Sequence, residues 1–456
     1  MYIGNKGYTI PKQLLTESQQ YAVKRELAFS PKSYLPVPPF YAYRESANKL
    51  YVPRYYGEQK FGTAPSKLET PEPIDVEFKG VIRDAQIPAV DAFMAAGHGL
   101  LELPCGFGKT ILGLYLISQL KVKTLIVVHK EFLLEQWLER IAEFLPTAKV
   151  GRIQGTTLDV EGKDIVIGML QSLSMKEYDP AVFRQFGFTI IDETHHIVAE
   201  VFSNALFKIV TPHMLGLSAT MERADGLTKV FKLFLGEVCF SVKREKNRSV
   251  VVQAIRYAHP DKDFNEVALN FKGQANYAVM MRKVCEFNPR KDFIVRVLAQ
   301  VVADGAEQIM VLSHSRAQLD YFKAAIDHQA IAPAAYYVGG MKAAALKESE
   351  AARIILATFA MAEEALDIKT LTTLVLASPK TNVTQAVGRI LRVAHAKPLI
   401  VDVVDSHDTF NRQWKKRKAF YSSNGYAIQE SSNSTYPEMR LPVQAKKEKT
   451  VCMLAF

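Results

Sequence analysis

The segment at residues 103–110 combines two glycines, a lysine and a threonine at a spacing that can bind the phosphates of a nucleotide. Gly106 and Gly108 allow backbone N–H groups to turn towards phosphate oxygens, which a Cβ atom would obstruct. The Lys109 side chain can reach the terminal phosphates, and the Thr110 hydroxyl can ligate Mg²⁺. Leu103 occupies the place of the first glycine of the usual pattern. We therefore expect ATP and Mg²⁺ as cofactors, with the phosphates cradled by Pro104, Cys105, Gly106, Phe107, Gly108, Lys109 and Thr110.

A second pair of reactive side chains, Asp192 and Glu193, follows an apolar run at residues 188–191. If that run is a strand of a parallel sheet, both carboxylates lie at its carboxyl end, where α/β sheets bind ligands. Asp192 can then hold Mg²⁺ through its water shell, and Glu193 can polarise the water that attacks a phosphate. The alternative is an acidic first turn of a helix, which the upstream phosphate loop makes the weaker explanation.

The third group of chemical interest lies near the end of the chain, where Gln385 precedes Arg389 and Arg392. The two arginines are spaced i, i+3, so in a helix they share one face and can reach a common anion. An arginine that reaches a γ-phosphate accelerates its transfer by roughly 10³- to 10⁵-fold. Two surface arginines on an ordinary helix are the alternative. Together the three groups predict one catalytic set acting on an ATP between two lobes: Lys109, Asp192, Glu193, Gln385, Arg389 and Arg392.

Short apolar runs that alternate with helical patterns would position these groups. The expected strands are 124–128, 165–168, 188–191 and 214–217, then 308–312, 334–338, 353–357 and 374–376, with an amphipathic helix at 131–144. Strands that are apolar throughout and separated by helices are typical of parallel sheets covered on both faces. Because the alternation restarts, we expect an α/β fold with two tandem lobes, each built on a parallel sheet, and a small N-terminal accessory domain.

Four segments follow from this pattern: an accessory domain at 1–79, a first lobe at 80–255, a linker and second lobe at 256–420, and a basic tail at 421–456. The accessory domain has 13 Tyr and Phe beside 11 Lys and Arg, and its runs at 40–45 and 50–56 predict a hairpin. Such aromatic side chains can stack on exposed bases or form the core of a small domain, and we expect core for most of them.

Charge and composition narrow the class of protein. The net charge is +10, and residues 1–79 (11 basic, 8 acidic) and 411–456 (9 basic, 3 acidic) supply +3 and +6 of it. A near-neutral centre with basic ends favours a polyanionic partner held at the flanks, although charge alone fits simple solubility equally well. The four cysteines are widely spaced, and neither a secretion signal nor an apolar run of about 18 residues is visible. We expect an intracellular, soluble protein, in the cytoplasm of a bacterial host or in a nucleus or viral factory.

The order of these motifs resembles a superfamily 2 helicase of the DExH type, across roughly residues 80–420. Motif I matches 103–110, motif II 192–195, motif III 218–220, motif V 358–367 and motif VI 385–392, and residues 82–86 look like the adenine-reading Q-type motif. Within the superfamily, the likeness is to XPB-like DNA translocases and their viral and phage relatives, such as UvsW-like branch-migration helicases and the poxvirus transcript-release helicase. Ala224 stands where that family has an acidic residue, which puts any duplex-melting role of the 223–225 element in doubt, and Ala365 of motif V stands where glycine is usual, a small departure.

The resemblance implies RecA-like lobes and three sets of contacts. Arg83, Gln86 and Asp367 would join the phosphate loop at the nucleotide. One strand of nucleic acid would contact His129, Lys130, Gly155, Thr156, Gln171, Ser172, Ser313, His314, Ser315 and Thr358, with Lys415, Lys416 and Arg417 on a flanking duplex. The hydroxyl residues among these could instead cap helices, and the basic run around Trp414 could be a solvated helix face.

These contacts leave the exact task open. We expect DNA rather than RNA as the substrate, because the Pro-Thr-Arg-Glu-Leu-Ala element of DEAD-box RNA helicases is absent and motif VI begins with Gln385 rather than histidine. The resemblance to XPB-like translocases, with the basic flanks, implies a helicase that acts on forked or branched DNA and moves 3′ to 5′. A transcript-release or RNA helicase is the alternative, and a translocation subunit of a nuclease is a weaker one. A monomer is favoured.

Overall fold

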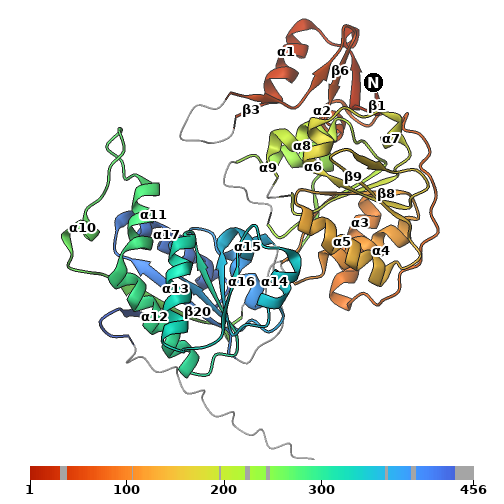
Figure 1. Ribbon diagram of the computed structural model, residues 1–456. Helices are drawn as coiled ribbons and strands as arrows, with labels where there is room; N and C mark the ends of the chain where they lie inside the picture. The colour runs from red at the N-terminus through yellow and green to blue at the C-terminus, as the bar shows by residue number, and fades with distance from the viewer. Residues whose placement is uncertain are drawn as a thin grey trace, which may run out of the picture. The chain divides into compact units, whose positions relative to one another are not determined.

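The computed structural model describes residues 1–30, 38–104, 106–194, 197–220, 226–242, 247–364, 368–391 and 397–436, without the side chains of residues 343, 363 and 364. The chain forms two compact units, Met1–Arg244 and Glu245–Phe456. Each unit contains a large parallel sheet with helices on its faces (Figure 1). The α/β fold with two parallel-sheet lobes that the sequence predicts is therefore confirmed. Among the described helices, none is long and apolar enough to cross a membrane.

The first unit begins with a small antiparallel module. Its sheet has the order β1-β2-β6-β5, and β3 pairs with β4 beside it. The elements are β1 (Tyr2–Gly4), β2 (Gly7–Pro11), a 3₁₀ turn at Lys12–Leu14, α1 (Glu17–Glu26), β3 (Ala28–Phe29), β4 (Phe40–Tyr41), β5 (Arg44–Glu45), β6 (Lys49–Val52) and α2 (Arg54–Phe61). The expected hairpin exists as β5 and β6, but it is shorter than predicted, because Phe40 and Tyr41 pair with β3 and Pro53 ends β6 and starts α2. The aromatic side chains of Tyr8, Phe29, Phe40, Tyr55 and Tyr56 are buried, and Tyr43 and Phe61 pack partly buried against the core, whereas Tyr21 and Tyr41 are exposed.

The lobe of the first unit is an eight-stranded sheet of order β10-β9-β11-β8-β12-β13-β7-β14, in which only the β9–β10 pair is antiparallel. Its strands are β7 (His98–Glu102), β8 (Thr124–Val128), β9 (Val150–Gln154), β10 (Thr157–Asp159), β11 (Ile165–Met169), β12 (Phe188–Ile191), β13 (His213–Ser218) and β14 (Val238–Ser241). Its helices are α3 (Ile87–Ala96), preceded by a 3₁₀ turn at Asp84–Gln86, α4 (Lys109–Leu120), α5 (Glu131–Phe144), α6 (Leu170–Met175), α7 (Ala181–Arg184), α8 (Ala199–Leu206) and α9 (Thr228–Leu235).

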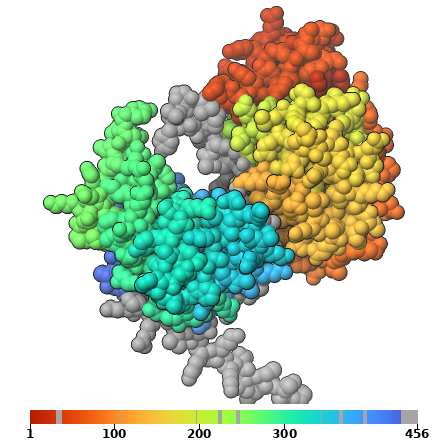
Figure 2. Space-filling model, viewed as in Figure 1, coloured from red at the N-terminus to blue at the C-terminus, as the bar shows by residue number. Residues whose placement is uncertain are grey.

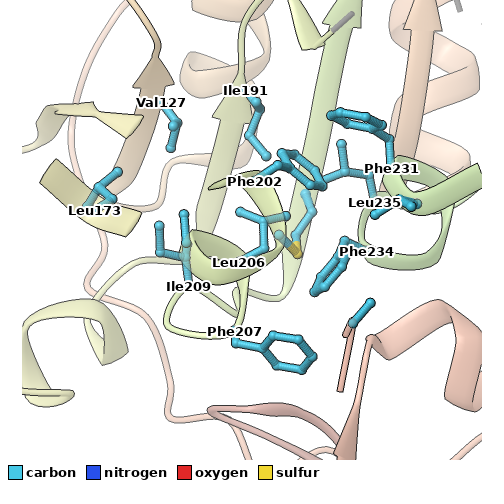
Figure 3. Packing of buried hydrophobic residues seen from close by; sticks show 14 of the residues in the cluster. Val127, Leu173, Ile191, Phe202, Leu206, Phe207, Ile209, Phe231, Phe234 and Leu235 are labelled. Carbon is cyan, nitrogen blue, oxygen red and sulfur yellow. The ribbon is translucent and has the colours of Figure 1, made fainter. Parts of the chain in front are cut away.

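The module and this lobe share one hydrophobic core. Phe202 and Phe207 of the α8 region pack against Phe231 and Phe234 of α9, with ring centroids 4.3 Å apart for Phe202–Phe231 and 5.2 Å apart for Phe207–Phe234 (Figure 3). From the module, the Arg44 guanidinium lies 4.8 Å from the centroid of the Phe207 ring and donates a hydrogen bond to Asn204. The module (red in Figure 2) is therefore a fixed part of the first unit.

The second unit is built on a seven-stranded, entirely parallel sheet of order β17-β18-β16-β19-β20-β15-β21. Its strands are β15 (Val251–Tyr257), β16 (Ile309–Ser313), β17 (Ala334–Tyr337), β18 (Ile354–Thr358), β19 (Thr373–Leu376), β20 (Leu399–Asp405) and β21 (Ala427–Ser432). Its helices are α10 (Lys262–Asn265), α11 (Tyr277–Glu286), α12 (Asn288–Ala303), α13 (Arg316–His328), α14 (Ala343–Ser349), α15 (Phe359–Glu364), α16 (Thr384–Ile390) and α17 (Asp408–Ser423).

Three expected domain limits differ from the structure. The limit at 255/256 falls inside β15, which pairs with β20 and so belongs to the second unit. Residues after 421 are not simply a tail, because β21 extends the second sheet next to β15. The limit at 79/80 is also late, since Ile74 and Val76 are already buried in the lobe core.

Candidate nucleotide and nucleic-acid site

The phosphate loop joins β7 to α4 in the first unit. Gly108 lies at the N-cap of α4 with φ of +87°, and Gly106 has φ of +82°, a backbone region that side chains disfavour. A Cβ atom at Gly108 would lie 2.6 Å from Nε2 of Gln86, so the loop is closed around that glycine. Lys109 and Thr110 follow as the first two residues of α4, where helix N–H groups and the helix dipole favour an anion. The loop thus has the backbone of a phosphate cradle.

Arg83 and Gln86 lie directly against this loop. The Gln86 side chain is buried, and its Nε2 donates to the carbonyl oxygens of Phe107 (2.9 Å) and Gly108 (3.4 Å), while its Oε1 accepts from the backbone N–H of Arg83 (2.8 Å). The Arg83 guanidinium also donates to Phe107. Both side chains therefore brace the loop from outside. The adenine-reading role that the resemblance implies for Gln86 stays a prediction.

Asp192 and Glu193 lie at the carboxyl end of β12, as the sequence predicts. Asp192 is buried, its Oδ2 accepts a hydrogen bond from the indole N–H of Trp137 (2.9 Å), and its Oδ1 accepts from the backbone N–H of Glu193 (2.9 Å). Glu193 has φ of +49°, a strained conformation for a residue with a side chain, of the kind that persists at functional sites. Its Oε1 lies 3.5 Å from Nζ of Lys109. The phosphate loop and the acidic pair are thus in direct contact.

The electrostatics of Asp192 fit a cation site. Burial, followed by the negative charge of Glu193, raises the pKa of Asp192 to about 6, against the hydrogen bond from Trp137 and the charge of Lys109. A carboxylate held in this way gains most from a hard cation nearby. No cluster of three or more His, Cys, Asp or Glu side chains that could hold a metal occurs among the described residues. A Mg²⁺ ion usually takes one or two protein carboxylates and completes its shell with water and substrate phosphates.

Motif III connects the two parts of this site. Ser218 ends β13, between β12 and β7, and its carbonyl oxygen accepts the backbone N–H of Leu103 (2.8 Å) at the start of the phosphate loop. Its hydroxyl bonds to the carbonyl oxygen of Thr220 (2.5 Å). A change at residues 218–220 therefore reaches the loop through the backbone.

Most residues expected to contact nucleic acid in the first unit gather in one place. His129, Lys130, Gln171 and Ser172 line a shallow groove of about 520 Å³, and Nε2 of Gln171 donates to the carbonyl oxygen of His129 (2.9 Å). The turn at Gly155 and the exposed Thr156 is tied to the same wall, because the Gly155 N–H donates to the Ser172 hydroxyl (2.9 Å). Hydroxyl, amide and lysine groups suit phosphates better than base edges.

Two residues of the second unit that were expected to contact nucleic acid, Ser313 and Ser315, instead bond within the protein. Ser313 is fully buried, and its hydroxyl donates to Oε1 of Gln318 (2.7 Å) and accepts the N–H of Ser315 (2.9 Å). Ser315 in turn caps α13 by accepting the N–H of Gln318 (3.2 Å). The Ser313 prediction is therefore wrong, and the capping alternative holds for Ser315.

His314 and Thr358 remain candidates. His314 follows the end of β16, where its ring is partly buried beside Phe359 (ring centroids 4.6 Å apart), and its Nδ1 and backbone N–H both lie 2.9 Å from the Ser378 hydroxyl. Thr358 ends the neighbouring strand β18 and is half-buried. Gln385 and Arg389 lie on α16, and Nε of Arg389 donates to the carbonyl oxygen of Ala362 (2.9 Å).

Only some of the basic side chains on α17 are exposed. Lys415 and Lys416 are exposed, but the Arg417 guanidinium is buried and binds both carboxylate oxygens of Asp402 at 2.7 and 2.8 Å. The nucleic-acid contact expected of Arg417 is therefore wrong. The remaining predicted site residues Cys105, Asp367 and Arg392 lie outside the described residues.

One part of the site has no counterpart in the sequence prediction: the hydrogen bond from Trp137 to Asp192. A buried tryptophan usually finds a partner for its N–H, which was the only available signal. The partner lies 55 residues away, so the sequence could not identify it.

Comparison with known proteins agrees with this geometry. The family model described as the type III restriction enzyme, res subunit, matches residues 79–223, which contain the phosphate loop and the acidic pair. A protein of Acanthamoeba polyphaga mimivirus, provisionally named an ATP-dependent RNA helicase, is 32% identical over 448 residues, or 93% of this chain and 85% of the relative. A provisionally named helicase of invertebrate iridescent virus 6 is 26% identical over 373 residues (77% of this chain, 83% of the relative).

Two further similarities extend the set. A provisionally named ATP-dependent RNA helicase of African swine fever virus is 27% identical over 366 residues, which is 74% of this chain and 70% of the relative. The crystal structure of T4 UvsW aligns over 92% of this chain and 96% of its own, with a TM-score of 0.37 and 16% identity. The near full-length similarity to the mimivirus protein, together with the ordered motifs, shows that the chain belongs to superfamily 2 of the helicases and is an ATP-dependent nucleic-acid helicase.

Proposed function

We propose that this helicase moves along DNA from 3′ to 5′ and remodels forked or branched DNA, as in branch migration or fork regression during repair and recombination. The observation that carries the proposal is the groove lined by His129, Lys130, Gln171 and Ser172, which lies on the same sheet edge as the acidic pair. Its polar groups fit a sugar–phosphate backbone, and binding of that kind does not depend on sequence. A motor that works at any branch point requires such binding.

The preference for DNA depends on two features of the sequence. Motif VI begins with Gln385, and residues 128–137 stand where RNA helicases of the DEAD-box type carry a different element. The N-terminal module adds rings with adjacent cations: Lys6 lies 5.3 Å from the centroid of the half-buried Tyr51 ring, and Lys67 lies 4.4 Å from that of the half-buried Tyr2, and both rings line a pocket between the module and the lobe. Aromatic rings with adjacent cations stack well on unpaired bases.

In the proposed reaction, Lys109 contacts the terminal phosphates of ATP and Glu193 polarises the attacking water. The 3.5 Å contact between these two side chains suggests how binding prepares catalysis. A phosphate that attracts Lys109 would release the carboxylate of Glu193 to accept a hydrogen bond from water. Thr110 and Asp192 would hold Mg²⁺, which neutralises charge on the β- and γ-phosphates when it is bound. We propose further that Arg389 stabilises the transferring phosphoryl group.

A second candidate is an RNA helicase or transcript-release factor. It is favoured by the provisional names of the mimivirus and African swine fever virus relatives, which give RNA as the substrate. Both candidates use the same ATP-hydrolysing lobes, so an experiment must distinguish DNA from RNA as the substrate. A nuclease subunit has less support: Glu77-Phe78-Lys79 resembles half of a metal-dependent nuclease site, but that site also needs an upstream aspartate, and residues 1–74 contain none.

The deciding experiment compares stimulation of ATP hydrolysis by single-stranded DNA, duplex, forked DNA, a four-way junction and RNA of the same sequence. We expect forked and four-way DNA to stimulate most, and matched RNA to stimulate least. Displacement of strands with a 3′ or a 5′ tail then gives the direction. If RNA stimulates hydrolysis as strongly as forked DNA, the DNA assignment is wrong and transcript release becomes the leading function.

A further inference from the structure

Trp137 holds the carboxylate expected to bind Mg²⁺. Its side chain is 1% exposed, and its indole N–H donates to Oδ2 of Asp192 at 2.9 Å. The other oxygen, Oδ1, is held by the backbone N–H of Glu193 at 2.9 Å. With both oxygens held, the carboxylate plane of Asp192 has a fixed orientation. An indole N–H is a donor only, so this contact also favours the charged, accepting form of the carboxylate.

The ring of Trp137 lies against the helix that follows the phosphate loop. A Cβ atom at Gly113 of α4 would stand 3.0 Å from Cη2 of Trp137, so the glycine leaves the space that the ring fills. The same position would meet Ile190 of β12 at 3.4 Å. Trp137 is therefore wedged between α4 and β12, the two elements that carry Lys109 and Asp192.

The helix that carries Trp137 begins at the groove. Lys130 is the N-cap of α5, and His129, Lys130 and Glu131 all line the groove wall. Trp137 follows Lys130 by seven residues, which is about 10 Å along a helix at roughly 1.5 Å per residue. About two turns of α5 thus separate the groove from the Asp192 carboxylate.

We propose that Trp137 is a positioning residue through which the occupancy of the nucleic-acid groove reaches the magnesium-binding carboxylate of Asp192. A nucleic-acid strand that contacts His129 and Lys130 moves or immobilises the start of α5. Because Trp137 lies on the same helix, this change alters the position of the Asp192 carboxylate. The proposal rests on the functions proposed above for the groove and for Asp192. A purely structural role predicts that any aromatic side chain of similar size serves equally well.

The first test compares two matched substitutions. The chain has two tryptophans, and Trp414, buried in the second unit on α17, provides the control. Trp137→Phe keeps an aromatic ring and removes the N–H, and it should raise the Mg²⁺ concentration for half-maximal ATP hydrolysis by roughly 10- to 100-fold, the usual effect of losing a side chain that orients a metal ligand. Trp414→Phe should leave the Mg²⁺ requirement unchanged. Equal Mg²⁺ requirements in the two variants would overturn the proposal.

The second test leaves Trp137 intact and needs no turnover. In Trp414→Phe, Trp137 is the single tryptophan, so its fluorescence reports on the Asp192 contact. We expect its emission to change when Mg²⁺ and a non-hydrolysable ATP analogue are added, and when single-stranded DNA alone is added. Asp192→Asn should abolish the Mg²⁺ response. Emission that responds to the nucleotide but is indifferent to DNA overturns the link between groove and carboxylate.

Glu193→Gln is measured beside these variants to separate the two levels of the account. If Glu193→Gln hydrolyses ATP normally, the roles proposed for the site are themselves wrong. If it is inactive while Trp137→Phe behaves as Trp414→Phe does, only the inference about Trp137 fails.

Discussion

Removing the guanidinium of Arg417 should destabilise the second unit strongly. Arg417 makes two hydrogen bonds to Asp402 and one to the carbonyl oxygen of Lys380, and Tyr421 adds a hydrogen bond to the same carboxylate at 2.9 Å. Burial and the charge of Asp402 raise the pKa of Tyr421, so its hydroxyl stays a donor. The substitution Arg417→Met fills similar space but leaves a buried, uncompensated carboxylate.

The expected cost is about 3–5 kcal/mol, the usual effect of removing one partner of a buried ion pair. For a unit of this size, each kcal/mol lowers Tm by roughly 2–4 °C, which gives a decrease of about 6–20 °C. Thermal and urea unfolding followed by circular dichroism measure both quantities. The neighbouring Lys416→Met is the matched control, because its side chain is exposed and its effect should stay within about 0.5 kcal/mol.

A double variant makes the test sharper. Arg417→Met combined with Asp402→Leu removes both charges, and it should recover much of the lost stability, since apolar replacements of buried ion pairs are often neutral or better. The reasoning is refuted if Arg417→Met is as stable as Lys416→Met. The burial of Arg417 is also refuted if Arg417→Met reduces the salt dependence of DNA binding, because the Arg417 side chain would then contact DNA phosphates.

Three further outcomes are expected. Replacing Lys415 and Lys416 by alanine should lower the salt slope of duplex binding by roughly 0.9 for each DNA phosphate that is no longer neutralised, without changing Tm; an unchanged slope in a binding titration would show that both are solvated surface. Gly57→Ala should destabilise the first unit by about 1–3 kcal/mol in urea unfolding, because a Cβ atom there would stand 2.1 Å from the Tyr8 ring; wild-type stability would contradict the packing of α2 on β2. Partial burial of the ring and the nearby charge of Lys380 lower the pKa of His314 from 6.5 to about 4, so His314 is neutral when folded and the wild type should lose stability relative to His314→Gln as the pH falls from 6.5 towards 4; parallel stability curves would contradict that environment.

The sheets were predictable because their strands are apolar throughout. The runs at 124–128 and 188–191 and the helix at 131–144 coincide with β8, β12 and α5, and their periodicity alone distinguishes buried strand from amphipathic helix. The strand β15 was missed as part of the second sheet. It pairs with β20, nearly 150 residues later, and no local pattern shows which sheet a strand joins.

The site was predictable where function requires a residue type at a fixed spacing. Lys109, Asp192 and Glu193 are brought together as expected, because Asp192 and Glu193 directly follow β12 and Lys109 begins α4 after the loop that leaves β7. Ser313 and Arg417 were misplaced for a common reason. From sequence alone, a hydroxyl or a guanidinium is expected at the surface. The structure shows that Ser313 and Arg417 are instead buried, because each has a buried hydrogen-bonding partner, Gln318 and Asp402 respectively.

The central claim is that Glu193 activates water for ATP hydrolysis beside a phosphate held by Lys109. Single-turnover hydrolysis of ATP in the presence of forked DNA, compared between wild type, Glu193→Gln and Lys109→Ala, tests it most directly. The account predicts that Glu193→Gln binds ATP almost normally but hydrolyses it about 10²- to 10⁴-fold more slowly, whereas Lys109→Ala loses both binding and hydrolysis. Hydrolysis by Glu193→Gln at the wild-type rate would contradict the account.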